Sequence, residues 1–141
     1  MITATKLREV MTKNVVTISS ADPIWDIQRI FSINHLRHAP VCEDGKVMGM
    51  ISLIDLRHHR SEEDREDVSN QEVQKLTAVQ IMAPDPVTLQ GNQTVKEAAL
   101  LFTENEFHAI PVLEGGTLVG IISTTDMISF LIDALDQKED N

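Results

Sequence analysis

The sequence predicts an α+β fold, close in character to α/β, in which one β-α-β-β-α unit occurs twice. Three observations lead to this prediction. The chain aligns with itself when it is shifted by 71 residues. Short apolar strand-like runs alternate with longer segments of helical periodicity. Apolar residues make up 42% of the 141 positions, which is the usual share for a protein with a packed core.

The internal repeat is the strongest of these observations. Between residues 11–56 and 82–127 the shifted sequences share 13 identities in 46 positions, without a gap. Many of the identities are residue types that set backbone geometry: Pro40 and Pro111, Gly45 and Gly116, Gly49 and Gly120, Ser52 and Ser123, Asp55 and Asp126. We therefore expect two copies of one supersecondary unit, with a first repeat in 1–60, a charged linker or helix in 61–79, and a second repeat in 80–141.

Each copy is expected to open with a short strand, at residues 15–18 and 87–89, followed by a helix. In the first copy Asp22 can cap the helix and Pro23 can occupy its first turn. In the second copy Thr94 and Glu97 have the spacing of a capping box, in which each side chain accepts a hydrogen bond from the other residue's backbone amide.

The second half of each copy is expected to form a hairpin and a final helix. Strands around 39–41 and 110–112 each contain a proline, which favours a sheet edge or a strand start. The following strands, 47–51 and 118–122, are almost wholly apolar, so both of their faces should be buried. The last helix, around 127–135, is apolar over most of its surface and therefore needs a partner surface, either within the chain or in a dimer.

Composition excludes several classes of function. The net charge is −10 and aromatic residues are only 4% of the chain, which argues against binding to nucleic acid. The single cysteine, Cys42, excludes an internal disulfide and a thiolate zinc site. No signal sequence and no apolar run of the ~20 residues that span a bilayer is present, so a cytoplasmic protein without a membrane partner is expected.

The repeated pattern resembles the tandem cystathionine-beta-synthase (CBS) domain pair, also called the Bateman module. Each copy has a methionine before its first strand, an apolar-Pro-Val strand, and the pattern Gly-apolar-apolar-Ser-x-x-Asp at its last helix. The resemblance covers roughly residues 8–135. It implies two repeats packed through their sheets about a pseudo-twofold axis, and clefts between them that take adenosine-containing ligands such as AMP, ADP, ATP or S-adenosylmethionine.

The resemblance also implies a sensor without catalysis. In such modules an adenine nucleotide is a regulatory ligand and no cofactor is obligatory. The module commonly forms a homodimer and acts on an effector protein, which the sequence does not identify. The alternative is an interaction or dimerisation scaffold whose clefts are empty.

The candidate site for ribose and phosphate is the start of the last helix in each copy. One interpretation is purely structural, with the serine and the aspartate capping the helix. The other uses the same geometry, because a helix N-terminus offers amides to a phosphate and a carboxylate one turn later can accept both hydroxyls of a ribose. The residues concerned are Ser52, Asp55, Ser123, Thr125 and Asp126.

The resemblance places the adenine against the opposite wall, where apolar side chains would sandwich the ring and free backbone groups would bind its edge. The residues that it implicates are Thr17, Ile18, His38, Ala39 and Pro40 in one cleft, and Thr88, Leu89, His108, Ala109, Ile110 and Pro111 in the other.

Charge distinguishes the two halves. Residues 1–71 contain 9 basic and 11 acidic side chains, whereas residues 72–141 contain 3 and 11. An anionic phosphate should therefore be drawn to the first half, where Arg37, Arg57 and Arg60 are possible contacts. A solvated helix end is the competing interpretation for Arg57 and Arg60.

Two further interpretations have weaker support in the sequence. The five histidines are not accompanied by the Cys or carboxylate residues of a clear ligand set, so no metal site is predicted. An enzyme that used His38 or His108 as a base would lack a nucleophile or metal partner, and no catalytic residues are predicted.

Overall fold

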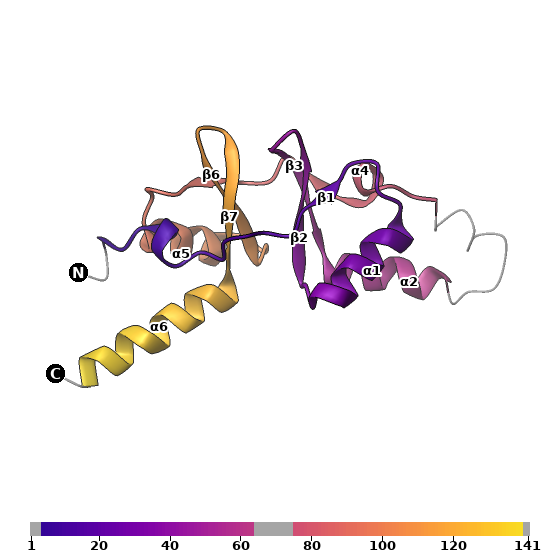
Figure 1. Cartoon of the computed structure of the whole chain (residues 1–141). Helices are drawn as coiled ribbons and strands as arrows, with labels where there is room; N and C mark the ends of the chain where they lie inside the picture. Colours follow the sequence, from indigo (N-terminus) through magenta and orange to yellow (C-terminus); the bar gives the residue numbers. More distant parts are fainter. Residues whose placement is uncertain (1–3, 64–74, 140–141) are drawn as a thin grey trace. The chain divides into compact units, whose positions relative to one another are not determined.

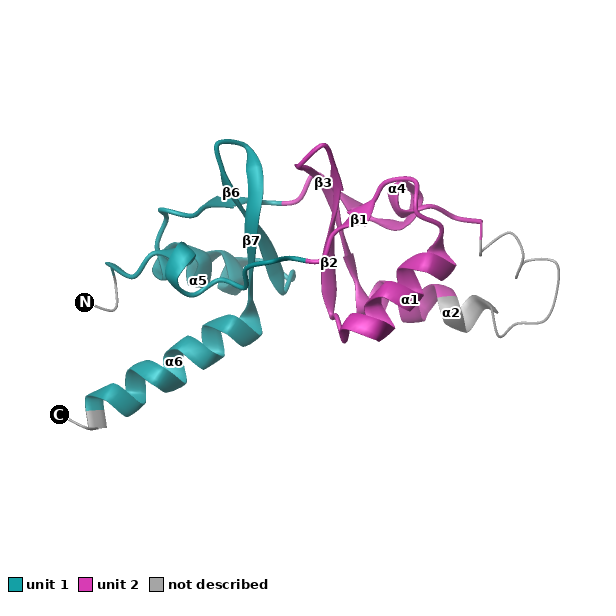
Figure 2. Cartoon of the chain, in the orientation of Figure 1, with its two compact units in different colours: residues 1–15, 87–141 teal, residues 16–86 magenta. Residues whose placement is uncertain are grey.

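The computed structural model describes residues 4–63 and 75–139, which form two compact units (Figure 1). Unit 2 is the continuous segment 16–86, whereas unit 1 combines residues 1–15 with 87–141 (Figure 2). The mixed α and β content and the duplicated order of elements confirm the predicted fold class.

Unit 2 contains a four-stranded sheet in the order β1-β2-β3-β4. Its strands are β1 (Ile18–Ser19), β2 (His38–Glu43), β3 (Lys46–Ser52) and β4 (Ala83–Pro84), and its helices are α1 (Ile24–Asn34), α2 (Leu53–Glu63) and α4 (Ala78–Ile81). β1 runs parallel to β2, and β3 is antiparallel to both of its neighbours. Figure 1 shows α1 and α2 next to each other, on one face of this sheet.

Unit 1 repeats the arrangement with a three-stranded sheet in the order β5-β6-β7. Its strands are β5 (Leu89–Gln90), β6 (Ala109–Glu114) and β7 (Thr117–Ser123), and its helices are η2 (Leu7–Glu9, a 3-10 turn), α5 (Val95–Glu104) and α6 (Thr124–Glu139). The parallel β5–β6 pair and the antiparallel β6–β7 hairpin match the first copy residue for residue, including an irregularity after Val41 and after Val112.

The compact units do not follow the order of the repeats. Each unit contains a segment from the other half of the chain, which we call its entry segment: residues 4–12 in unit 1 and residues 76–84 in unit 2. In unit 2 the amide of Ile24 donates to the carbonyl of Leu76 at 2.8 Å, and in unit 1 the equivalent Val95 donates to Thr5 at 2.9 Å. Thr12 pairs with Ile121 through both backbone groups, at 2.9 and 3.0 Å. The first fifteen residues therefore complete unit 1.

Each unit has its own hydrophobic core. The core of unit 2 lies between the sheet and its helices, around Ile24, Ile27 and Phe31 of α1 and Leu56 of α2, all at most 2% exposed. The core of unit 1 includes Leu7 from the entry segment, which has no exposed surface. Because burial of a leucine or isoleucine side chain contributes about 1.5–3 kcal/mol, these clusters are the main source of stability in each unit.

The starts of the two equivalent helices differ from one another. The capping box at Thr94 is present: its hydroxyl accepts from the Glu97 amide at 3.2 Å, and Glu97 accepts from the Thr94 amide at 3.1 Å. The predicted cap by Asp22 is wrong, because Pro23 is the residue that precedes α1 and Asp22 instead accepts from the Ser19 amide at 3.0 Å. The carbonyl of Leu76 satisfies the first amide of α1 in its place.

The prolines of β2 and β6 are buried rather than at a sheet edge. β2 has a strand on either side, yet its pairing with β1 begins only at Val41, so Pro40 lies beyond the end of β1. The same holds for Pro111, because β5 pairs with β6 from Val112 onward. A residue without an amide hydrogen is tolerated there because that flank of the strand has no ladder partner.

Candidate functional site

The helix starts of α2 and α6 have the capping geometry that the sequence predicts. The Asp55 amide donates to the Ser52 hydroxyl at 3.1 Å, and the Ser52 amide donates to the Asp55 carboxylate at 3.4 Å. At the second turn the corresponding distances are 3.0 Å and 2.9 Å, between Ser123 and Asp126. Both serine–aspartate pairs are therefore structural caps, and the two interpretations of these residues are compatible.

The two aspartates have different surroundings. Asp126 is half-buried and also accepts from the hydroxyl of Thr12, at 3.2 Å and 3.3 Å to its two oxygens. Asp55 is exposed, and the residue equivalent to Thr12 in the other copy is Ala83, which has no hydroxyl. Asp126 is thus held by side-chain and backbone donors from two segments, which fixes the orientation of its carboxylate.

Sequence reasoning missed Thr12. It lies in the entry segment, before the first predicted strand, and only the backbone pairing of residues 12 and 121 brings it to the start of α6. The one available signal is that the first copy has Thr12 where the second has Ala83. This difference can be interpreted only once it is known that residues 4–12 belong to unit 1.

The residues proposed to contact adenine fall into two groups. Four have side chains with surface available to a ligand, fully or in part: Thr17, His38, Thr88 and His108. The others are buried and belong to the interior of their units, namely Ile18, Ala39, Pro40, Leu89, Ala109, Ile110 and Pro111. The buried group can support the wall but presents little side-chain surface of its own.

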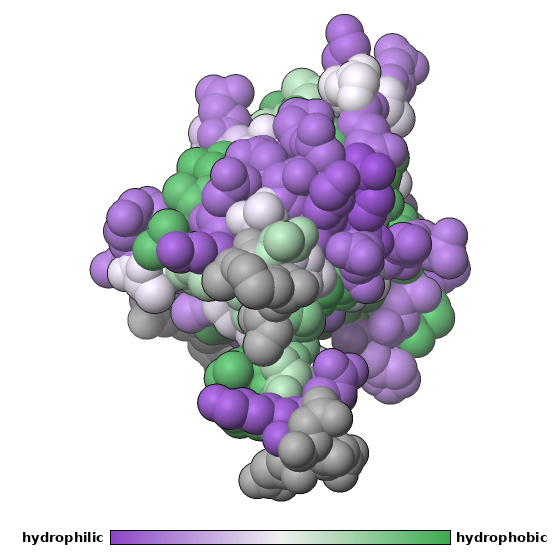
Figure 3. All heavy atoms as spheres, turned by 90° about the vertical axis from the view of Figure 1, so that its left-hand side faces the viewer, coloured by the Kyte–Doolittle hydropathy of each residue, from purple (hydrophilic) through white to green (hydrophobic). Residues whose placement is uncertain are grey.

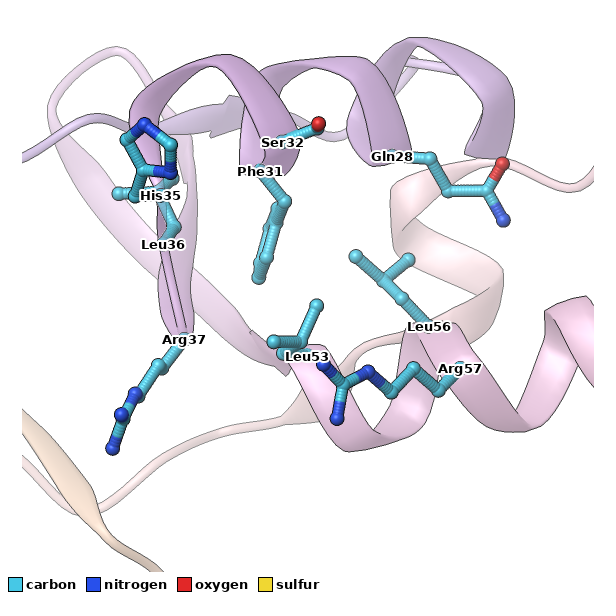
Figure 4. Close-up of a pocket in the computed structure, with 9 residues that line it drawn as sticks. All are labelled: Gln28, Phe31, Ser32, His35, Leu36, Arg37, Leu53, Leu56 and Arg57. Carbon is cyan, nitrogen blue, oxygen red and sulfur yellow. The ribbon is translucent and has the colours of Figure 1, made fainter.

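Two of the predicted phosphate contacts line a pocket in unit 2. The pocket has a volume of about 530 Å³ and lies between α1 and α2. Figure 4 shows the side chains of its nine lining residues: Gln28, Phe31, Ser32, His35, Leu36, Arg37, Leu53, Leu56 and Arg57. Ser52 and Asp55 are not among them. The side chain of Arg60, the third predicted contact, lies outside the described residues.

Other polar groups of unit 2 have local roles. Glu43 accepts hydrogen bonds from the hydroxyl and the amide of Ser20, and these bonds lower the pKa of its carboxyl. Partial burial raises the pKa of the Cys42 thiol, which disfavours the reactive thiolate. Within the described ranges no three His, Cys, Asp or Glu side chains lie together as a metal site would require. No helix there is long and apolar enough to cross a bilayer.

Comparison with curated proteins finds relatives in distant organisms. The chain is 29% identical over 135 residues to the uncharacterized protein MJ0188 of Methanocaldococcus jannaschii, covering 95% of this chain and 47% of that protein. A CBS domain-containing protein of Dictyostelium discoideum is 27% identical over 135 residues, covering 92% and 93% of the two chains. The chain thus spans about half the length of MJ0188 and nearly all of the Dictyostelium protein.

Solved structures share the fold. CBSX2 of Arabidopsis thaliana, a CBS-pair protein, superposes with a TM-score of 0.80 at 20% identity, covering 99% of both chains. A structure of CBSX2 in complex with AMP has a TM-score of 0.77 at 22% identity, covering 95% and 98%. The CBS domain pair of MJ0100, in complex with 5′-methylthioadenosine and S-adenosyl-L-methionine, has a TM-score of 0.77 at 22% identity, covering 93% and 98%.

The duplicated units, their matching registers and these likenesses agree with a direct match to a family model. The CBS domain model matches residues 7–62 and again residues 78–133, which together make up most of the chain. The protein therefore belongs to the CBS domain family, as a tandem pair.

Proposed function

We propose that this CBS pair is a non-catalytic sensor that binds an adenosine-containing ligand, with Asp126 as the ribose-binding carboxylate. The observation that carries the proposal is the fixed orientation of Asp126 by Thr12 and the Ser123 amide. A carboxylate has about four acceptor positions, so these bonds leave capacity for a ribose diol. Thr125, which is exposed, supplies a further hydroxyl at the same helix start.

Two further observations support the proposal. The solved CBS pairs CBSX2 and MJ0100 hold AMP or the methylthioadenosine and S-adenosylmethionine pair. Within this chain, His38, His108, Thr17 and Thr88 keep surface near the ends of β2, β6, β1 and β5, where an adenine edge can meet backbone groups. CBS pairs are in general regulatory modules, and on that basis we propose no catalytic residue.

Binding would act by population shift. A ligand changes a protein's conformational equilibrium only by binding one arrangement more tightly than another. We propose that ligand binding changes the conformation of the two-unit module or of a homodimer, and that a separate effector protein detects this change. The alternative, a scaffold with empty clefts, is favoured by one observation: the equivalent turn in unit 2 has Leu53 and Ile54 where unit 1 has Thr124 and Thr125.

Calorimetry with AMP, ADP, ATP and S-adenosylmethionine tests the proposal. We expect saturable heat with at least one ligand, and a loss of affinity of about tenfold or more in Asp126→Asn, since a charge-assisted hydrogen bond contributes about 1.5–3 kcal/mol. Asn keeps a carbonyl oxygen for the cap, so the fold should persist. Asp55→Asn is the matched control for the equivalent turn. Absence of heat with all four ligands would contradict the proposal and favour the scaffold instead.

A further inference from the structure

We propose that the pocket between α1 and α2 of unit 2 is a second ligand site, which binds a small amphipathic anion: an apolar group carrying a phosphate or carboxylate. All nine lining residues lie in unit 2, and the serine–aspartate turn is not part of the lining. The inference therefore does not depend on the nucleotide site proposed above.

The size and the walls of the pocket suit a small organic molecule. Its volume of about 530 Å³ lies within the ~300–1,000 Å³ range of ligand pockets. The apolar part of the wall comes from both helices and from the loop that follows α1. Phe31 belongs to α1, Leu36 lies in that loop before β2, and Leu53 and Leu56 belong to α2. In Figure 4 the Phe31 ring and both α2 leucines point into the space between the helices.

The charged part of the wall selects an anion. Arg37 and Arg57 both line the pocket, no carboxylate does, and neither arginine forms a salt bridge with any side chain that the structure describes. Figure 4 shows Arg57 directed back along α2 toward Leu53, whereas the Arg37 side chain extends away from the space between the helices. The guanidinium group of Arg57, which has no salt-bridge partner among the described side chains, matches the oxygens of a phosphate or carboxylate, which Arg binds through two parallel hydrogen bonds.

An unsatisfied donor lies beside the pocket. The Nε2 atom of Gln28 is buried and has no hydrogen-bond partner in the described part of the chain. A buried donor without a partner costs about 1–3 kcal/mol, so native proteins rarely retain one without a reason. Gln28 lines the opposite end of the pocket from Arg37 in Figure 4, but its Nε2 atom has almost no accessible surface, so a ligand in the pocket does not contact this atom.

The second repeat supplies an internal comparison. The residues equivalent to Arg37 and Arg57 are His108 and Ile128, and Gln28 becomes Ala99. Leu36 becomes Phe107, whose ring packs edge-to-face on Phe102 with centroids 6.0 Å apart. The two arginines are thus specific to the first copy, and so is Leu53, which becomes Thr124, whereas Phe31, Leu36 and Leu56 have the apolar equivalents Phe102, Phe107 and Met127.

The test uses the full chain and phenyl phosphate as probe, followed by NMR of amide and methyl groups. We expect saturable shifts at Leu36, Leu53 and Leu56, and an affinity at least about tenfold higher than for inorganic phosphate, since the ring buries apolar surface that phosphate lacks. A parallel titration with 3-phenylpropionate shows whether the site prefers a phosphate or a carboxylate head group.

Substitutions taken from the second repeat locate the site. Arg57→Ile should weaken phenyl phosphate binding about tenfold or more, and Leu36→Phe should abolish it by filling the pocket. Arg29→Ile is the matched control, because it removes an exposed cation from α1 that does not line the pocket. Shifts confined to other residues, or unchanged affinity in both pocket variants, would overturn the inference. A calorimetric titration with AMP on the same variants reports on the nucleotide site separately.

Discussion

Equivalent residues of the two repeats have acquired different environments, and the aspartates at the starts of α2 and α6 illustrate this best. The capping role is common to both, because it depends only on a serine and an aspartate three residues apart. The second role is local to Asp126, because only the entry segment of unit 1 carries a hydroxyl at the required position. We therefore expect the two turns to differ in ligand binding although their backbones match.

Glu43 provides a pH-dependent prediction at the same scale. Hydrogen bonds from Ser20 lower its pKa from the ordinary value of 4.5. A lowered pKa in the folded state stabilises the fold above the unfolded value, and this contribution is lost as the pH falls through the folded value. An NMR titration should place the Glu43 midpoint below 4.5, and Ser20→Ala should return it toward 4.5. Ser32→Ala, which removes a distant hydroxyl, should leave the midpoint unchanged.

At the scale of elements, local sequence signals predicted the order of strands and helices but not their ends. The strands expected at 15–18 and 87–89 are instead Ile18–Ser19 and Leu89–Gln90, which overlap the expected ranges in one residue each, because only those residues meet a partner on β2 or β6. Strand length depends on where the neighbouring strand begins, and this is information that the segment itself does not contain.

The exchange of entry segments could not be predicted for a related reason. Residues 4–12 and 76–84 contain the short turns η2 and α4, but their place in the fold comes from backbone pairing with the far half of the chain. The cap formed by Ser123 and Asp126 was predicted because it rests on short-range spacing. The contact of Thr12 with Asp126 was missed because it rests on long-range pairing. The pocket between α1 and α2 could not be predicted either, because its lining residues follow no regular spacing in the sequence.

Gly49 and Gly120 allow a matched test of these pairings. A Cβ at Gly49 would lie 2.8 Å from the backbone oxygen of Ala83 and against the Met82 side chain. A Cβ at Gly120 would meet only the flexible side chain of Met11 among its nearest neighbours, at 2.9 Å and 3.0 Å from Cγ and Cε. Gly49→Ala should therefore cost about 1–3 kcal/mol of unfolding free energy and Gly120→Ala less. Urea denaturation measures both, and an equal or reversed order would contradict the assigned packing of β4.

At the scale of the whole molecule, the exchange makes each half of the chain depend on the other. Leu7 precedes the first repeat's strands, yet it lies fully buried in the core of unit 1. Leu7→Ala should lower the free energy of unfolding by about 2–5 kcal/mol. Amide exchange should accelerate first in β6 and β7, which belong to the second repeat. Acceleration confined to residues 16–63 would show that the entry segment belongs to unit 2.

The helix α6 of unit 1 carries several exposed apolar side chains. Figure 3 views the chain from the side on which unit 1 is drawn, and this face carries mainly hydrophilic residues with hydrophobic ones in several separate places. Against that background α6 has four half-exposed apolar side chains at helical spacing: Ile128, Leu131, Ile132 and Leu135, each 52–58% exposed. They form a continuous stripe along one side of the helix.

Because a continuous apolar stripe on a helix is costly in water, we expect α6 to pack against a second copy of the chain, as the proposed homodimer requires. Leu131→Glu places a charge at the centre of the stripe and should shift the protein from dimer to monomer in sedimentation equilibrium. The loss should be at least about tenfold in the dimerisation constant, since burial of an unpaired carboxylate costs several kcal/mol. Asp133→Lys, on the same helix but outside the stripe, is the control. A wild-type protein that is monomeric at all concentrations would refute this role for α6 and leave the stripe without a partner.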